Sequence, residues 1–500
     1  QTGMDSGKKR LPWHMVEGKG GNGGMETYSL RSEKDVARMF GSVDTSQHQV
    51  KRRSDQVNFV DTVHILKKGG KHGQGYASGN KQVNKQDWFF SCHFWCDPVM
   101  PGSLGIESMF ECMEYWSITQ GLTSGFQSAS FGHGSGETQW KYRGQLTPRN
   151  DRMDNEVHIK SVTRNPDGSV DVVADAGLYV DNLRVYGATD LRLRIEESKE
   201  ANAVSAAQSS IPRSMPTASS SIVQRQQPPA KYMKWGGPKL GKPALMTWHP
   251  LAGKNGNPTP GFQPTAYPPR AVQLIPFPGN PNDNNHEPGV LPLSWVNLME
   301  FTANRTSLCL GPAFVRFDGS NSSRMPAFDL QLVTRVLSVE GMEYGDFHGV
   351  DCNPGKGKMT AEFDCPADAW FFQGSTTSDH MPYSILMEIA LQVSGVLTSW
   401  LKAPLTLDRD DLLFRNLDAK VTLVKDIDLR NKTIKNVTTA KSYSMLGSMG
   451  IHTFHVEMSV DNEVFYIVDT SFGWFLPEVF EKQTGMDSGK KRLPWHMVEG

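Results

Sequence analysis

Two apolar runs of helical length stand out from a chain that otherwise alternates between apolar and polar positions. The runs are "SLGIESMFECMEYWSITQGL" at 103–122 and "YSILMEIALQVSGVLTSWL" at 383–401. After each run come segments in which every second residue is apolar, the period of a half-buried strand. A long helix followed by antiparallel strands predicts an α+β fold in which a sheet wraps around the helix. The pattern occurs twice, so we expect two such units.

The expected strands fall in matching order behind the two helical runs. They are "EVHIKSV", "SVDVVADAGLYV" and "LRVYGATDLRLRI" in the first half, and "DAKVTLVKDIDL", "IHTFHVEMSV" and "VFYIVDTSFGWF" in the second. Short echoes support a duplication: "DWFF" at 87–90 returns as "AWFF" at 369–372, and "VDNLRVY" at 180–186 as "VDNEVFY" at 460–466. We interpret the halves as two copies of one domain.

A second repetition is literal. Residues 1–18 and 483–500 are the same letters, "QTGMDSGKKRLPWHMVEG". A circular permutation, a unit cut from a tandem array, or a linker written twice would each leave this pattern. From the way the two copies join their neighbours, we infer a native order of residues 201–500 followed by 19–200.

These patterns divide the chain into segments of different composition. A stretch rich in Ser, Ala, Pro and Gln has too few large apolar residues to fold alone, and we interpret it as a linker. The stretch after it is rich in Pro and Gly but contains Trp and Phe, and we interpret it as an arm packed on the second domain. The expected segments are a lead-in at 1–50, a first domain at 51–198, a flexible linker at 199–240, an arm with a lead helix at 241–325, a second domain at 326–482 and the repeat at 483–500.

Charge and cysteine content limit the kinds of partner and the cellular compartment that the sequence favours. With 52 Lys and Arg against 53 Asp and Glu, the chain shows no excess that calls for nucleic acid or an anionic membrane. No apolar stretch reaches the roughly 18 residues of a spanning helix, and the first residues lack a signal peptide's apolar segment. The 6 cysteines are too few for a disulfide framework. We therefore expect a soluble, cytoplasmic protein without a membrane span.

The candidate chemistry lies in "WFFSCHFWCDPVMPGSLGIESMF" at 88–110. Residues 88–90 look like the end of a buried strand that delivers Cys92 and His93 to a turn stiffened by prolines. Pro101, Gly102 and Ser103 then open the helix, with Ser103 as a possible cap. The free amides of a helix start suit a thioester oxygen.

Glu107 lies about one turn into the same helix among apolar residues. Burial there should raise the pKa of its carboxyl group, which suits a general acid. A His and a buried acid beside an apolar tunnel could remove an α-proton and expel a β-hydroxyl group.

Other readings of this region are weaker. Cys92 and Cys96 flank His93, but a zinc site lacks a second ligand pair at suitable spacing, so buried cysteines are favoured and no metal is expected. "GGKHGQG" at 69–75 lacks the lysine and hydroxyl of a phosphate loop and reads as a hairpin turn. The basic runs at 67–73 and 141–152 could dock an acidic carrier protein, although such runs are more often solvated faces.

The stretch from Trp88 to Phe110 resembles the active-site signature of the hot-dog-fold 3-hydroxyacyl-acyl carrier protein dehydratases, the β-hydroxydecanoyl dehydratase/isomerase family. Most of residues 50–480 is similar to the tandem dehydratase region of polyunsaturated fatty acid synthases. The resemblance implies a double hot dog in which catalytic residues meet across the interface. It implies His93 as base and the Gly102 amide on the thioester oxygen, with Cys92 and Pro101 lining the substrate site. Glu107 stands where the family commonly has Asp.

The second copy departs from the family pattern. Its His position falls on Ser375, while its acid survives as Glu388, six residues after Pro382 as Glu107 is six after Pro101. If the His of one hot dog pairs with the acid of the other, as in the family, His93 works with Glu388. Glu107 would then face Ser375 and be idle, and the second copy would be a pseudo-domain. His380 could replace the missing His only if the turn were rethreaded.

The resulting hypothesis is a hydro-lyase that converts 3-hydroxyacyl thioesters to trans-2-enoyl thioesters in polyunsaturated fatty acid synthesis, with isomerisation to the cis-3-enoyl product left open. We expect no bound cofactor, because the acyl chain arrives on the phosphopantetheine of an acyl carrier protein. Other synthase domains would be the remaining partners. A hot-dog acyl thioesterase and a non-catalytic acyl-binding or scaffold module stay open as alternatives.

Overall fold

The computed structural model describes residues 24–40, 53, 56–94, 97–198, 292–320, 325–340, 354–374, 380–447, 449–491 and 495, without the side chains of 312, 373 and 374. The linker predicted at 199–240 and the arm up to residue 291 lie outside these residues. So do Cys96, Ser375 and the first copy of the literal repeat.

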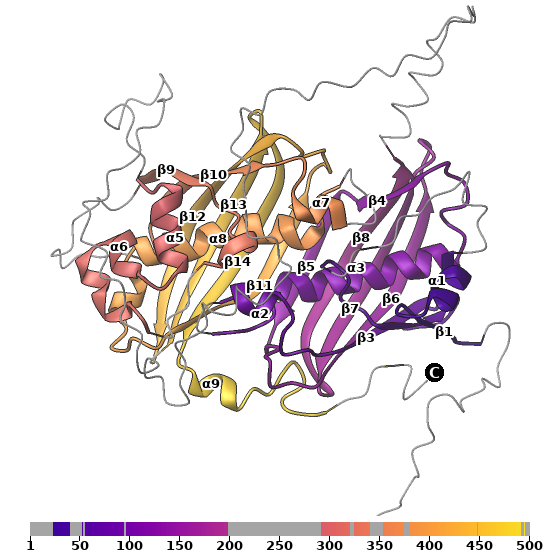
Figure 1. Ribbon diagram of the computed structural model, residues 1–500, viewed down its shortest axis with the longest axis horizontal. Coiled ribbons are helices and arrows are strands. Elements are labelled where there is room, and N and C mark those ends of the chain that lie inside the picture. The colour runs from indigo at the N-terminus through magenta and orange to yellow at the C-terminus, as the bar shows by residue number, and fades with distance from the viewer. Residues whose placement is uncertain are drawn as a thin grey trace, which may run out of the picture. The chain divides into compact units, whose positions relative to one another are not determined.

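The first hot dog is built around helix α3 (Gly102–Thr119), which lies across one face of an antiparallel sheet (Figure 1). Every residue from Ser103 to Ile118 is buried, so the helix needs neighbours on all sides. Two shorter helices accompany it, α1 (Glu33–Phe40) and α2 (Phe89–Cys92). The strands are β1 (Glu26–Ser29), β2 (Thr62–Leu66), β3 (Tyr76–Gln82), β4 (Ala129–His133), β5 (Gly136–Tyr142), β6 (Arg152–Arg164), β7 (Val170–Val180) and β8 (Leu183–Glu197).

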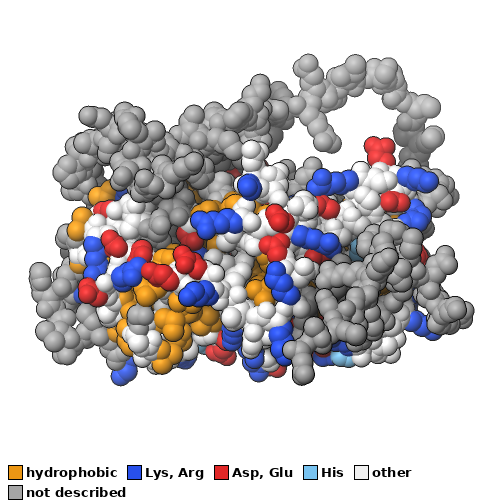
Figure 2. All heavy atoms as spheres, turned by 90° about the horizontal axis from the view of Figure 1, so that it is seen from below, with side chains coloured by type: hydrophobic (Ala, Val, Ile, Leu, Met, Phe, Trp, Pro, Cys, Tyr) orange, Lys and Arg blue, Asp and Glu red, His pale blue; other side chains and the backbone are white. Residues whose placement is uncertain are grey.

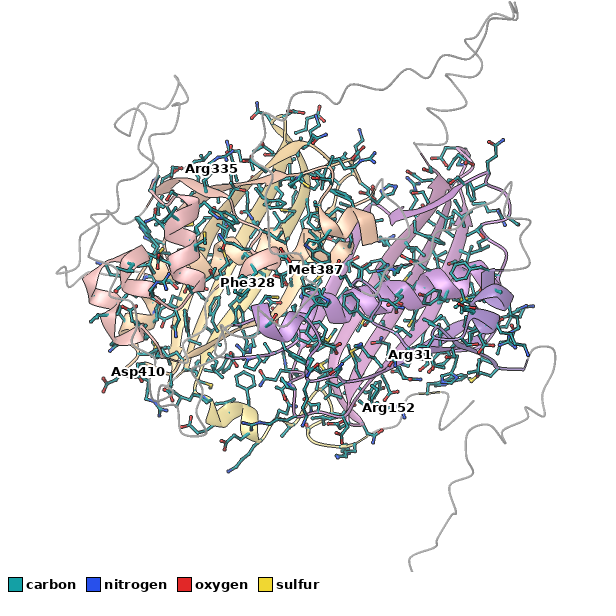
Figure 3. The ribbon with its side chains drawn as sticks, viewed as in Figure 1. Arg31, Arg152, Phe328, Arg335, Met387 and Asp410 are labelled. Carbon is teal, nitrogen blue, oxygen red and sulfur yellow. The ribbon has the colours of Figure 1, made fainter. Side chains whose placement is uncertain are left out.

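The second hot dog repeats this plan around helix α8 (Tyr383–Trp400), with α7 (Trp370–Gly374) in the place of α2. Its strands are β9 (Arg335–Glu340), β10 (Gly357–Cys365), β11 (Leu413–Leu423), β12 (Lys432–Leu446), β13 (Met449–Val460) and β14 (Glu463–Phe475). Further short helices are α5 (Trp295–Thr302), α6 (Thr306–Leu310), η3 (Pro312–Phe317), η4 (Phe328–Leu330), η5 (Ala403–Thr406) and α9 (Glu478–Glu481). In Figure 3, Met387 of α8 lies near the junction of the two halves.

One sheet runs through both hot dogs. Its strand order is β1-β2-β3-β6-β7-β8-β5-β11-β14-β13-β12-β10-β9, with β4 paired to β8. The halves meet where β5 pairs with β11, with Gln139 opposite Lys420 at the centre of the register. From that pair outward the strands follow equivalent orders, so the halves are related by an approximate two-fold axis. The helices α3 and α8 also contact each other.

Most of the predicted elements are confirmed. Both long helices and the alternating strands are present, and residues 69–75 form the hairpin turn that joins β2 to β3. The "VDN" turns adopt the left-handed conformation, with φ of 48° at Asp181 and 53° at Asp461. In that region Asn and Asp are the side chains best tolerated after Gly.

Three expectations differ from the structure. Residues 89–92 form the short helix α2 rather than a strand end. The segment expected as a lead-in contributes β1, which pairs with β2, so the first hot dog begins before residue 51. The strands expected to match are not all equivalent: "EVHIKSV" lies in β6, whereas "DAKVTLVKDIDL" starts in β11, the equivalent of β5, so β12, the equivalent of β6, is not among the expected strands.

The described part of the second copy of the literal repeat, residues 483–491 and 495, contacts the first hot dog. The Met486 N–H donates to the Arg184 carbonyl at 2.7 Å, and the Gln145 N–H donates to the Gln483 side chain at 2.9 Å. The ring of Trp495 lies 5.0 Å from that of Tyr76.

Basic and acidic side chains are interspersed on the face shown in Figure 2. Within the described ranges, none of the helices is both long and apolar enough to cross a membrane.

Candidate active site

His93 follows α2 directly and is held by the turn that leads to α3. Its Nδ1 lies 3.1 Å from the carbonyl oxygen of Val99. Because a carbonyl can only accept, Nδ1 carries the proton in this bond and Nε2 is left with a free lone pair. Burial, with a smaller contribution from the Arg415 charge, lowers the pKa of His93 to about 3 despite the bond to Val99. The imidazole is therefore neutral near pH 7, as a general base must be.

The start of α3 is open to a ligand oxygen. Pro101 precedes the helix and no side chain caps it. The Leu104 and Gly105 N–H groups donate to the Pro101 carbonyl, so the N–H groups of Gly102 and Ser103 are the ones left without an intrahelical partner. The expectation that Ser103 caps the helix is wrong, because its hydroxyl donates to Glu388 at 2.6 Å instead. Gly102 is required by a close approach: a Cβ there would lie 2.7 Å from Cζ of Tyr142.

Glu388 reaches this helix start from α8 of the second hot dog. Its side chain is buried and accepts hydrogen bonds from Ser103 and, at 3.0 Å, from Nε2 of Gln392. Burial raises the pKa of Glu388, and the two hydrogen bonds offset only part of that effect. Its charge also helps to raise the pKa of Cys92, the residue before His93, so the two lie near each other. A carboxyl group that tends to stay protonated thus sits at the helix start, near the segment that carries His93.

Cys92 and Pro101 shape the site through their backbone positions and their packing. The Cys92 thiol is buried and contacts the Phe89 carbonyl, and burial raises its pKa. Its own carbonyl accepts the Ala327 N–H at 2.9 Å, which ties α2 to the segment before η4. Among the residues described, no three His, Cys, Asp or Glu side chains are placed to hold a metal ion.

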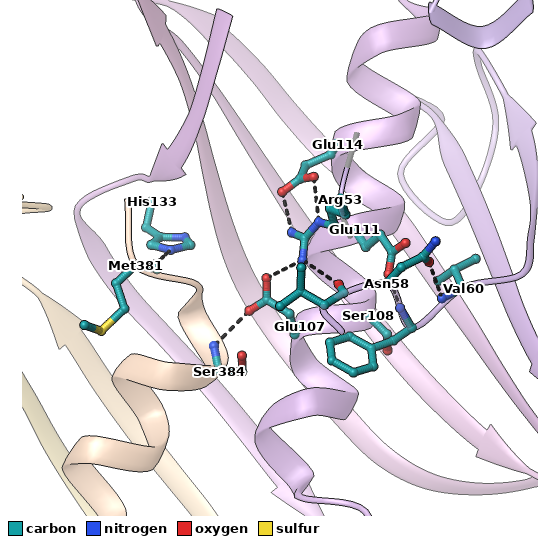
Figure 4. A network of polar contacts seen from close by, with 12 residues as sticks. Arg53, Asn58, Val60, Glu107, Ser108, Glu111, Glu114, His133, Met381 and Ser384 are labelled. Carbon is teal, nitrogen blue, oxygen red and sulfur yellow. Dashed lines mark hydrogen bonds and ion pairs between the residues drawn. The ribbon is translucent and has the colours of Figure 1, made fainter. Parts of the chain in front are cut away.

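Glu107 lies in a different environment from the one expected. Nη1 of Arg53 lies 2.8 Å from its Oε1, and the Ser384 N–H at the start of α8 donates to its Oε2 at 2.8 Å (Figure 4). Burial favours the neutral acid, but the Arg53 charge and the Ser384 hydrogen bond outweigh it and lower the pKa of Glu107. The predicted rise is wrong, and Glu107 is ionised.

Arg53 joins Glu107 to the buried Glu114 of α3, and its charge also acts on the buried Glu111 of the same helix. Its Nη2 lies 2.6 Å from Oε1 of Glu114. Glu111 accepts the Phe59 N–H at 2.8 Å, and burial raises the pKa of Glu111 to about 8. Sequence reasoning missed this network, because Arg53 is far from the helix along the chain and a buried ion pair has no local spacing signal.

The start of α8 carries a large side chain where the start of α3 carries a glycine. Pro382 is followed by Tyr383 where Pro101 is followed by Gly102, and the Tyr383 ring lies 4.8 Å from that of Phe110 in the first hot dog. Nδ1 of His380 contacts Asp426 at 2.8 Å, so this His is held by a carboxylate beside the turn.

Sequence comparison identifies the first unit. Residues 53–189 match the model of the FabA-like domain. The segment around α3 is therefore similar in sequence to a FabA-like domain.

The likeness extends to the whole chain in one relative. The chain is 43% identical over 509 residues to a polyunsaturated fatty acid synthase subunit of Thraustochytrium sp., an alignment that covers 93% of this chain and 34% of the relative. The chain spans about a third of the length of that relative. The aligned part includes both hot dogs in the order found here, which does not support the native order inferred from the literal repeat.

Solved structures give a distant likeness. The dehydratase domain from the terminal module of the rifamycin polyketide synthase is 9% identical with a TM-score of 0.35, covering 87% of this chain and 99% of that one. An acyl-CoA thioesterase II from Mycobacterium marinum is 7% identical with a TM-score of 0.31, covering 80% and 93%. Neither likeness separates a dehydratase from a thioesterase.

Proposed function

We propose that the chain dehydrates 3-hydroxyacyl thioesters to trans-2-enoyl thioesters in polyunsaturated fatty acid synthesis, at one site beside the start of α3. The observation that carries this proposal is the buried Glu388 of the second hot dog, bonded to Ser103 next to Gly102 and close to the segment that carries His93. A neutral base and a carboxyl group with a raised pKa are the two groups that the elimination of water needs.

The elimination then proceeds between these two groups. Nε2 of His93 takes a proton from C2 of the acyl chain, and the thioester oxygen gains negative charge beside the Gly102 N–H at the positive end of α3. As the C2–C3 double bond forms, the C3–O bond breaks and Glu388 gives its proton to the departing hydroxyl group, which leaves as water. His93 then releases its proton to solvent, and the Glu388 carboxylate takes up a proton from solvent, so both groups return to their starting forms.

An acyl carrier protein would deliver the substrate on its phosphopantetheine arm, with other synthase domains as further partners and the cytoplasm as the compartment. No bound cofactor takes part in this scheme. The relative's name supports the substrate class, and the FabA-like domain supports the reaction.

The test is product analysis with a 3-hydroxyacyl N-acetylcysteamine thioester. We expect the parent protein to form an enoyl thioester, seen by its absorbance and by the loss of one water in mass. His93→Ala should lower kcat by about 10³-fold, within the range for loss of a general base. Release of a free acid by the parent would instead indicate a thioesterase, and unchanged substrate that stays bound would indicate a binding module.

A further inference from the structure

Tyr142, the last residue of β5, lies against the open start of α3. A Cβ on Gly102 would be 2.7 Å from Cζ of Tyr142 and 3.0 Å from its hydroxyl oxygen. The charge of Glu388 also acts on this phenol. The Tyr142 hydroxyl group is therefore near both the helix amide and the acid of the proposed site.

This hydroxyl group has no hydrogen-bond partner among the residues that the structure describes, although it is fully buried. A buried polar group without a partner costs stability, so such a group calls for an explanation. Burial, together with the neighbouring Tyr186 and Glu388, raises the pKa of Tyr142 well above its usual value. The phenol therefore keeps its proton and can donate it in a hydrogen bond.

The second hot dog lacks the equivalent group. Gln139 and Lys420 face each other at the centre of the β5–β11 pair, and three residues further along each strand stand Tyr142 and Leu423. The second copy thus has the apolar Leu423 at the position equivalent to Tyr142, and its long helix begins with Tyr383 instead of Gly. The start of α8 also has a buried hydroxyl group without a hydrogen-bond partner among the described residues, but this group belongs to Tyr383 of the helix itself and not to the neighbouring strand.

We propose that the Tyr142 hydroxyl group binds the thioester oxygen of the substrate beside the Gly102 N–H, so that two donors hold this oxygen as it gains negative charge. The inference deepens the proposed function and rests on it. Tyr142 would be a catalytic residue, since it touches the reacting group.

The first test compares Tyr142→Phe with Tyr76→Phe, which removes a hydroxyl group from another buried ring of the same hot dog. Tyr142→Phe should lower kcat for dehydration by about 10²-fold with little change in KM, the usual loss for one oxyanion donor. It should melt no lower than the parent, because the lost hydroxyl group has no partner. Tyr76→Phe should keep kcat within about 2-fold of the parent, because the expected loss is specific to an oxyanion donor.

The second test separates the thioester oxygen from the 3-hydroxyl group. A saturated acyl N-acetylcysteamine thioester in D₂O exchanges its C2 protons through the same enolate but has no leaving group. Tyr142→Phe should slow this exchange about as much as it slows dehydration, whereas Glu388→Gln should leave the exchange nearly unchanged.

The outcomes distinguish the two claims. A parent protein that forms no enoyl product overturns the proposed function itself. A parent that is active while Tyr142→Phe keeps its kcat, or loses dehydration without losing exchange, overturns the role of Tyr142 on the thioester oxygen and leaves the dehydratase standing.

Discussion

The starts of α3 and α8 share a sequence pattern and differ in chemistry. Each follows a proline, and each carries a Glu six residues after it, Glu107 in one and Glu388 in the other. Each Glu crosses to the opposite helix start, where it meets Ser384 or Ser103. Yet the pKa of Glu388 is raised and that of Glu107 is lowered.

The difference comes from what lies around each carboxyl group. Glu388 has two neutral donors, which cannot compensate for its burial. Glu107 has the guanidinium group of Arg53, which is itself buried and has no counterpart in the contacts of Glu388 with the described residues. Position in a duplicated fold therefore does not fix the role of a carboxyl group, because one charged neighbour decides whether it is an acid or an anion.

The largest expected effect separates the two Glu residues by activity. Glu388→Gln should lower kcat by about 10³-fold, since an amide cannot donate the proton that the leaving hydroxyl group needs. Glu107→Gln should keep kcat within about 3-fold, since the ionised Glu107 is not the acid. Steady-state rates with the thioester substrate give the comparison, with thermal melts to show that both variants are folded. A dead Glu107→Gln beside an active Glu388→Gln would place the site at α8.

The next effect tests Arg53 by stability. Arg53→Met should lower the free energy of unfolding by about 3–5 kcal/mol, since it leaves buried carboxylates without their cation. Arg31→Met is the control: its ion pair with Asp61 involves a side chain that is 72% exposed, so the loss should be at most about 1 kcal/mol. Urea unfolding measures both.

The pH dependence of that loss sharpens the test. The pKa of Glu107 lies below its usual value of 4.5 in the folded protein, so its pairing stabilises the fold above pH 4.5 and this contribution is lost as the pH falls through the lowered pKa. The difference in the free energy of unfolding between the parent and Arg53→Met should therefore become smaller at acidic pH. If this difference in the free energy of unfolding stays constant or grows as the pH falls, Arg53 does not stabilise the fold through its charge pairing with Glu107.

The smallest effect concerns the neutral donors of Glu388. Activity should fall on the alkaline side as Glu388 loses its proton, and the Ser103 hydroxyl group favours the ionised form. Ser103→Ala should therefore raise the pKa of Glu388 and move the alkaline limb of kcat/KM up by about one pH unit. Ser108→Ala on the same helix removes a hydroxyl group that donates only to the Gly105 carbonyl, and should not move it. An alkaline limb that stays in place in Ser103→Ala would show that it reports another group.

Long regular patterns made much of the fold predictable. The apolar runs at 103–122 and 383–401 are too long for strands, and the alternating segments could only be strands with one buried face. The prediction of a strand end at residues 88–90 was wrong. Adjacent aromatic residues favour strands, whereas here they pack as a single helical turn. The sequence around Arg53 carries no periodic signal at all.

The site was predictable only in part. The His, the Pro-Gly turn and both Glu residues could be located from the sequence, and the crossing of the two carboxyl groups was expected from the family resemblance. The opposite pKa shifts of the two Glu residues could not be predicted, because the lowered pKa of Glu107 depends on Arg53, which is more than fifty residues away in the chain.

The shared sheet between β5 and β11 has an evolutionary consequence. In a homodimer encoded by one gene, any substitution appears in both subunits at once, so a Tyr at the helix start would block both sites together. Covalent fusion removes that constraint and lets each half drift under its own selection. One half can keep the base and the open amide while the other keeps little more than its acid, and the gene then specialises its two halves without a second copy of the enzyme.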